Sequence, residues 1–227
     1  MDREKSLSKA IAERRATRHF ESALVDEKDL GRILEAGRAA PSGYNLQPWR
    51  FVVVRDPEQR RRLREATMGQ AKVEEAPVVI VACGDPLGWK NGDLDELLKQ
   101  AAEVGAQTTA EQESVRRNVT KFLSVPGNHG GIAPDAAVWV NRQVMIAFTT
   151  MMWMAEVLGY ETAPMEGFWE DKVKQVLNIP GGIRVVALLA IGRHQGPERP
   201  YGGRFPLSKL FFAERWGEAL KLDGGEK

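Results

Sequence analysis

Residues 78–82 read Val-Val-Ile-Val-Ala, a continuous apolar run of strand length that is stopped by Gly84. A second apolar run covers residues 185–191 and is stopped by Gly192. Strands without polar alternation are typical of sheets that are covered on both faces. The two runs therefore predict central strands, and the sequence around them should supply the helices that cover the sheet.

Helix and strand signals surround these two runs. Asp26 is a suitable N-cap for a helix that ends before Pro41, and residues 51–54 form a β-branched run that predicts a third strand. The longest apolar helix is expected over residues 134–158, with Gly159 as its C-cap. Further helical segments are expected over residues 7–11, 57–68, 93–122 and 210–220. The whole pattern predicts a three-layer α+β domain.

The composition indicates one domain that spans residues 1–227, because the chain contains neither an internal repeat nor a low-complexity linker. Lys and Arg total 32 against 31 Asp and Glu, so the overall charge favours neither nucleic acid nor a membrane surface. The lone cysteine, Cys83, adjoins an apolar run, where a reduced core thiol is expected. The charged N-terminal residues lack the apolar stretch of a secretory signal, so we expect a cytoplasmic protein.

Several common catalytic motifs are absent from the sequence. Neither a Gly-rich dinucleotide fingerprint, a P-loop nor a Gly-x-Ser-x-Gly elbow occurs. The histidines His19, His129 and His194 have no partner at metal-ligand spacing, so no metal site is expected. We therefore expect a bound cofactor to supply the chemistry, and we assign no catalytic side chain.

The first candidate binding motif is basic and occupies residues 14–20, which read Arg-Arg-Ala-Thr-Arg-His-Phe. The guanidinium groups of Arg14, Arg15 and Arg18 repel one another unless an anion lies between them. Planar guanidinium groups suit a phosphate, which accepts paired hydrogen bonds. Taken alone, such a motif is more often a solvated basic face, and occasionally a contact to nucleic acid.

Three further motifs carry polar or glycine residues next to predicted strands. Residues 40–49 contain a Pro-Ser-Gly turn followed by amide side chains, which suit the polar edge of a planar heterocycle. Residues 163–168, Ala-Pro-Met-Glu-Gly-Phe, predict a loop in which glycine allows close approach of the backbone to a ligand. Arg193 follows the last apolar run, at a strand end where α/β sheets commonly bind ligands. Residues 40–49 and 163–168 could each also be an ordinary turn.

In this order and spacing, the four motifs resemble the nitroreductase family of flavoproteins. The family pattern runs Arg-Arg-Ser-x-Arg-x-Phe, Pro-Ser-x-x-Asn-x-Gln-Pro-Trp, Pro-Met-x-Gly-Phe and a C-terminal Gly-Arg. The resemblance covers residues 11–216. One departure is Ala16, which replaces the serine of the family pattern. A hydroxyl expected near the flavin is therefore missing, and we expect weaker hydrogen bonding to the cofactor rather than its loss.

The resemblance implies an α/β/α sandwich with a mainly antiparallel central sheet, which forms a homodimer with FMN at the interface. Residues 86–134 would form a variable lid that holds Trp89, Phe122 and His129, and residues 196–227 would form an arm that is exchanged between subunits. Dimer burial would account for an apolar stripe on the longest helix, which contains Met145, Phe148, Met152 and Met154. The core of a single chain is the alternative explanation for this stripe.

The resemblance also assigns cofactor contacts to individual residues. It implies phosphate and ribityl contacts from the four arginines, isoalloxazine contacts from the second motif, donated in part by the other subunit, and a backbone N–H that faces flavin N5 from the third motif. Gln70 is the loosest match, as a ribityl or pyrimidine contact. The implied FMN-binding residues are Arg14, Arg15, Arg18, Pro41, Ser42, Gly43, Asn45, Gln70, Glu166, Gly167 and Arg193.

The activity implied by the resemblance is a ping-pong reduction in which NAD(P)H reduces FMN and an acceptor reoxidises it. Nitroaromatic compounds or quinones are the expected acceptors. Two alternatives stay open from the sequence. One is a specialised relative, such as a reductive dehalogenase or a flavin-fragmenting enzyme. The other is a non-catalytic module that binds flavin or nucleic acid through the basic motif.

Overall fold

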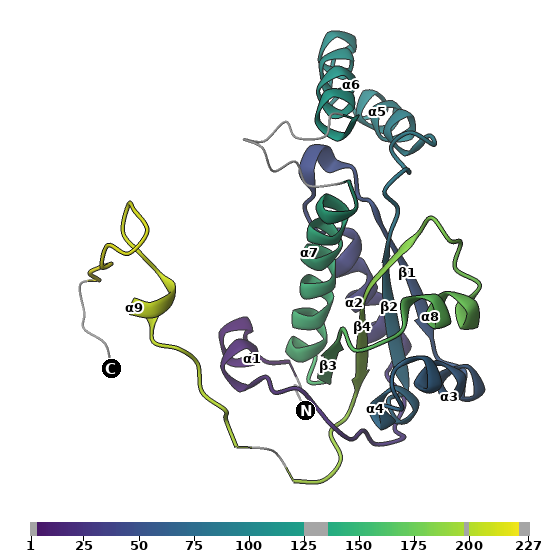
Figure 1. Cartoon of the computed structure of the whole chain (residues 1–227), viewed down its shortest axis with the longest axis vertical. Coiled ribbons are helices and arrows are strands. Elements are labelled where there is room, and N and C mark those ends of the chain that lie inside the picture. Colours follow the sequence, from purple (N-terminus) through teal and green to yellow (C-terminus); the bar gives the residue numbers. More distant parts are fainter. Residues whose placement is uncertain (1–3, 125–135, 198–199, 223–227) are drawn as a thin grey trace. The chain divides into compact units, whose positions relative to one another are not determined.

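The fold is built on one antiparallel sheet of four strands. The computed structural model describes residues 4–124, 136–197 and 200–222. Neighbouring strands follow the order β1-β2-β4-β3, and all three pairings are antiparallel (Figure 1). The expected α+β fold with an antiparallel central sheet is thus confirmed. The strands are β1 (Trp49–Val54), β2 (Val78–Gly84), β3 (Glu161–Met165) and β4 (Arg184–Gly192).

The two apolar runs form the central strands, as predicted. Every residue of β2 is buried, and Ile80 lies between Val53 of β1 and Leu189 of β4. Alternate residues of β2 point to opposite faces of the sheet. One set (Val78, Ile80, Ala82) packs in one apolar cluster and the other (Val79, Val81, Cys83) in a second cluster. Both faces of the sheet are therefore covered.

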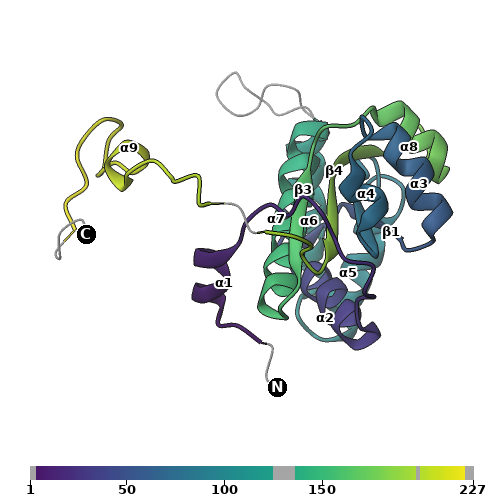
Figure 2. The same ribbon diagram turned by 90° about the horizontal axis from the view of Figure 1, so that it is seen from below.

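Helices on the two faces complete three layers (Figure 2). One face packs against α2 (Glu27–Arg38) and α7 (Ala136–Val157). The other face packs against α3 (Pro57–Ala66), α4 (Ala71–Glu75) and α8 (Glu170–Leu177). The Asp26 carboxylate accepts the backbone N–H groups of Lys28 and Asp29, which confirms it as the N-cap of α2.

Helix α7 is the central helix, and most of its apolar side chains serve the core of the chain itself. A Cβ atom at Gly37 would lie 2.7 Å from Met151 Cγ, so the glycine allows α2 to approach α7 closely. Phe148 and Met152 are also buried in this cluster. For Phe148 and Met152, the alternative of a core within one chain is therefore the one that the structure supports. Gly159, with φ of 82°, ends α7 in the left-handed conformation expected of a C-cap.

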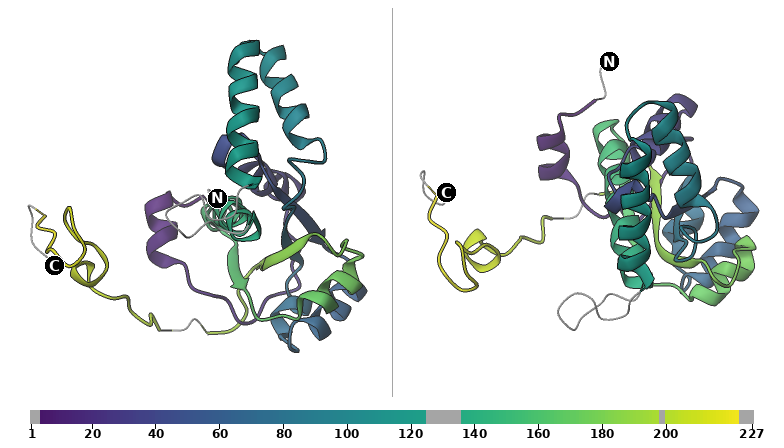
Figure 3. Two further views of the ribbon diagram at one scale, coloured as in Figure 1. Left: turned by 45° about the horizontal axis from the view of Figure 1, so that its top comes forward. Right: turned by 90° about the horizontal axis from the view of Figure 1, so that it is seen from above.

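Several boundaries differ from the sequence expectations. The predicted loop at residues 163–168 begins as the end of β3, where Pro164 is tolerated because β3 is an edge strand. The stretch over residues 93–122 forms two helices, α5 (Asp93–Glu103) and α6 (Thr109–Ser124), because Gly105 (φ 67°) interrupts it. These two helices lie side by side at the N-terminal end of α7 (Figure 3).

The chain divides into a main unit, Met1–Gly196, and a smaller unit, Pro197–Lys227. The predicted arm falls in the smaller unit. Its helix α9 covers only Leu207–Leu210, so the helix expected over residues 210–220 is wrong. There the chain turns back so that Phe212 pairs with Ala219, and Gly217 adopts a φ of 88°. Within the described residues, no helix combines the length and apolarity that crossing a membrane requires.

Candidate functional site

The first motif lies along the edge of the sheet. It follows α1 (Leu7–Glu13), and Ala16 pairs with Thr162 of β3 in parallel fashion, while Phe20 pairs with His194 just beyond β4. The backbone N–H of Thr17 donates to the carbonyl oxygen of Thr162 at 3.1 Å. These bonds bring the basic segment to the start of β3 and to the end of β4, which pair with each other through Glu161 and Gly192.

The arginine side chains differ in their surroundings. Arg14 is half-buried, and among the described residues its Nη1 atom is buried without a hydrogen-bond partner. Arg18 is exposed, and the Arg193 guanidinium lies over the ring of Tyr160 at 5.7 Å. Arg15 Nη1 donates to two carbonyl oxygens of its own segment, 2.8 Å and 2.9 Å away. A buried guanidinium nitrogen without a partner fits a missing anion.

A fifth cation joins this group from α4. Burial lowers the pKa of Lys72, and the nearby positive charge of Arg18 lowers it further. Two like charges held together in this way favour an anionic ligand between them. The sequence alone does not identify Lys72, because a single lysine belongs to no recognisable motif. Its position two residues after Gln70 is the only feature that points to it.

Gln70 and Gly167 come together although they are far apart in the sequence. The Gln70 side-chain amide donates to the carbonyl oxygen of Gly167 at 2.7 Å. A Cβ atom at Gly167 would meet Gln70 Nε2 at 3.5 Å, an ordinary contact distance. Packing within the described chain therefore does not require glycine at position 167. Close approach of a bound group to the backbone would explain why glycine occupies this position. The neighbouring Glu166 is exposed.

The second motif is anchored to Gln143, in the N-terminal half of α7. The backbone N–H of Gly43 donates to Gln143 Oε1 at 2.8 Å, and Ser42 Oγ accepts the backbone N–H of Gln47 at 2.9 Å. Pro41 and Asn45 are exposed. The segment is thus held by side chains while part of it stays accessible.

The backbone of this motif is strained. Tyr44, Asn45 and Gln47 have φ angles of 55°, 56° and 44°, in the left-handed region that residues other than glycine seldom adopt. Such conformations cost free energy and cluster at ligand-binding sites. The strain therefore supports a functional role for residues 44–47 rather than that of an ordinary turn.

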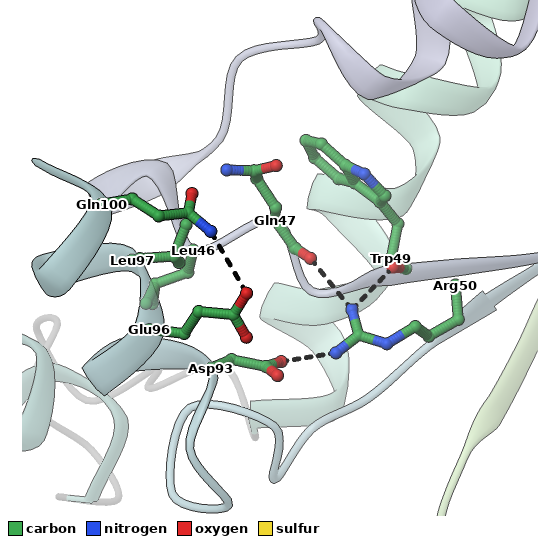
Figure 4. A pocket seen from close by; sticks show the side chains of 8 residues that line it. All are labelled: Leu46, Gln47, Trp49, Arg50, Asp93, Glu96, Leu97 and Gln100. Atoms are coloured by element: carbon green, nitrogen blue, oxygen red, sulfur yellow. Dashed lines mark hydrogen bonds and ion pairs between the residues drawn. The ribbon is translucent and has the colours of Figure 1, made fainter. Parts of the chain in front are cut away.

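A hollow of about 240 Å³ lies beside the second motif, between it and α5 (Figure 4). An ion pair of 2.6 Å between Arg50 and Asp93 joins its two sides. Farther along the predicted lid, the ring of Phe122 lies 5.9 Å from that of Tyr44. Trp89 is partly buried against the core, and His129 lies outside the described residues. The hollow between the second motif and α5 is lined by Leu46, Gln47, Trp49, Arg50, Asp93, Glu96, Leu97 and Gln100.

Within one chain, the motifs form two groups at opposite ends of α7. The second motif is bonded to Gln143, whereas the first motif pairs with Thr162, whose hydroxyl lies 2.6 Å from the carboxyl of Glu156. Residues 143 and 156 are thirteen positions apart, which is about 20 Å along the helix axis. Accordingly, α1 and β3 lie at the C-terminal end of α7 (Figure 1). The structure joins the first, third and fourth motifs and leaves the second apart.

Comparisons with known proteins identify the family of this chain. Residues 11–193 match the nitroreductase family. A Thermus thermophilus protein named NADH dehydrogenase is 37% identical over 201 residues, which cover 88% of this chain and 92% of the relative.

Solved structures share the fold. The ydfN protein of Bacillus subtilis, a nitroreductase by name, superposes with a TM-score of 0.82 at 26% identity, covering 91% of this chain and 97% of that one. An Exiguobacterium sibiricum protein solved in complex with FMN gives a TM-score of 0.79 at 22% identity, covering 92% and 98%. The chain therefore belongs to the nitroreductase family of FMN-dependent oxidoreductases, as its four sequence motifs predict.

Proposed function

We propose that this protein reduces nitroaromatic compounds, quinones or related conjugated acceptors with electrons from NAD(P)H, in a ping-pong cycle on FMN. Bound FMN supplies the atom, N5, that accepts hydride and passes it on. The observation that carries the proposal is the Nη1 atom of Arg14, which is buried without a hydrogen-bond partner among the described residues and belongs to the segment that pairs with the start of β3. The name of the Thermus relative supports a nicotinamide donor.

The cation group is proposed to bind the phosphate of FMN. Arg14 and Arg193 are half-buried, so their hydrogen bonds to a phosphate are shielded from water, while Arg18 and Lys72 add positive charge nearby. Arg15 is proposed to contact FMN from the same segment, in addition to the hydrogen bonds that its Nη1 atom donates to the backbone. The chemistry of this donor set fits a dianionic phosphate group.

The third motif and Gln70 are proposed to hold the flavin ring system. The bond from Gln70 to Gly167 fixes the loop that leaves β3, so the backbone at Glu166 and Gly167 is positioned before any ligand binds. By the family resemblance, a backbone N–H of this loop would face N5. No side chain is assigned as an acid or base.

A second copy of the chain is proposed to complete each site. The separation of about 20 Å along α7 keeps Pro41, Ser42, Gly43 and Asn45 away from the arginines of their own chain. A twofold-related copy would supply these residues from the other side. Exposed apolar side chains on α1 and α7, such as Leu7, Ile11 and Ile146, are available to such an interface. Exchange of the C-terminal arms is proposed to extend it.

A binding titration tests the phosphate site. Flavin-free protein is titrated with FMN and with riboflavin, which lacks the phosphate. Arg14→Ala or Arg193→Ala should weaken FMN binding about ten- to a hundredfold, the value of a charge-assisted hydrogen bond, with little change for riboflavin. Arg38→Ala is the matched control, because Arg38 pairs with Glu35 on the exposed surface of α2. Equal losses for both flavins would contradict the assignment.

Anaerobic half-reactions test the activity. NAD(P)H should bleach the bound flavin, and a nitroaromatic compound or quinone should restore its absorbance in a separate step. Failure of every such acceptor would remove the reductase proposal and favour a dehalogenase or flavin-fragmenting enzyme. Failure of NAD(P)H itself would favour a non-catalytic flavin-binding module.

A further inference from the structure

Glu156 is a buried carboxyl that the proposed function does not use. It lies near the C-terminal end of α7, and only 2% of its surface is exposed. Carboxyl groups are seldom buried unless a partner or a functional demand keeps them there. Its neighbours therefore indicate what it does.

The direct partner of Glu156 is the residue that holds the basic motif in place. The Thr162 hydroxyl is hydrogen-bonded to Glu156 Oε1 at 2.6 Å, and both groups are buried. The backbone of the same threonine pairs with Ala16 and accepts the N–H of Thr17. The carboxyl thus reaches the arginine segment through a single residue.

Charged groups from three segments act on Glu156. Burial raises the pKa of its carboxyl to about 7, the hydrogen bond from Thr162 and the positive charges of Arg14 and Lys5 oppose this rise, and Glu161 of β3 adds to it. No ion pair joins Arg14 to Glu156 in the described part of the chain, and Arg14 Nη1 has no hydrogen-bond partner there. The positive charge of Arg14 therefore acts on the Glu156 carboxyl, while its Nη1 atom is not used in an ion pair with that carboxyl in the described part of the chain.

We propose that Glu156 is a positioning residue that couples the binding of the FMN phosphate at Arg14 to the uptake of a proton. With the carboxyl protonated, the full charge of Arg14 acts on the phosphate. With the carboxylate formed, its negative charge competes with the phosphate for Arg14 and repels the phosphate directly. This inference rests on the proposed FMN site.

The test compares FMN affinity from about pH 5.5 to 8.5 in the wild-type protein and in Glu156→Gln, with riboflavin as a parallel ligand. Because the phosphate of FMN itself titrates near pH 6, the informative quantity is the difference between the two proteins. Across this range, the affinity of the wild type for FMN should fall about three- to tenfold more than that of Glu156→Gln. This is the effect of one charge roughly 12–25 Å from the phosphate at an effective dielectric constant near 20. Riboflavin affinity should not separate the two proteins.

Thr162→Val provides a second variant, which keeps the backbone pairing with Ala16 and removes only the hydroxyl. Because the hydroxyl favours the ionised carboxyl, its loss should move the midpoint of the pH dependence to higher pH. An unchanged midpoint would overturn the inference even if Glu156→Gln failed to fold. Parallel profiles for the wild type and Glu156→Gln, with FMN bound by both, would overturn it and leave the flavin site standing. A wild-type protein that binds no FMN would overturn both.

Discussion

The buried carboxyl of Glu156 makes a prediction for the flavin-free protein that is independent of ligand binding. Its pKa rises from 4.5 to about 7 on folding, chiefly through burial. The folded chain therefore holds this proton more tightly than the unfolded chain, and the free energy of unfolding falls as the pH rises from 4.5 to 7. Between about pH 5.5 and 8.5, this linkage lowers the free energy of unfolding of the wild type by about 2 kcal/mol. Glu156→Gln has no carboxyl at this position and should not show this decrease.

Urea unfolding at these two pH values, followed by circular dichroism, measures the effect. Glu156→Gln should gain about 2 kcal/mol relative to the wild type on going from the lower to the higher pH. Glu65→Gln is the matched control, because Glu65 is exposed on α3 whereas Glu156 is buried. A constant difference between Glu156→Gln and the wild type at both pH values would refute the assigned pKa and its cause.

Three further predictions concern the fold. Gly84→Ala should lower the free energy of unfolding by about 1–3 kcal/mol, because its Cβ would collide with Val140 of α7. In contrast, a Cβ atom at Gly31 on α2 would lie in open space, so Gly31→Ala should raise the free energy of unfolding by about 0.5–1 kcal/mol. A change of the same sign for both substitutions would be inconsistent with this packing. Because burial raises the pKa of Cys83 to about 11, its thiol should react with a disulfide reagent at about pH 8 only after denaturation; rapid labelling of the folded protein would refute this. Asp26→Ala should cost about 1 kcal/mol in urea unfolding through the lost N-cap of α2, and an unchanged midpoint would argue against the cap.

The sequence predicts the centre of the fold well because the determining signals there are local. The apolar runs of β2 and β4 and the Asp26 cap each occupy a few consecutive residues. Strand β3 is harder to predict, because Pro164 and the loop-like residues after it resemble a turn, and because β4 is the only strand of the sheet that pairs with β3 in the described residues. The expected helix at residues 210–220 fails because Gly217 and the pairing of Phe212 turn the chain back.

The site shows a similar division. The motifs identify most of the proposed ligands, but no local pattern predicts that Ala16 pairs with Thr162 and so brings the arginine segment to the start of β3. Lys72 and Glu156 gain their importance only from the charges that folding places near them. The location of the second motif at the far end of α7 likewise depends on a bond between residues 43 and 143. Such long-range contacts are set by the tertiary fold.

The central claim is that this chain holds FMN by its phosphate. The most direct measurement is the visible absorbance spectrum of the purified protein, followed by chromatographic identification of the flavin released on denaturation. We expect flavin absorption bands and the release of about one FMN per chain, since each chain of the proposed dimer supplies one set of phosphate ligands. Colourless protein that takes up no added FMN would contradict the claim.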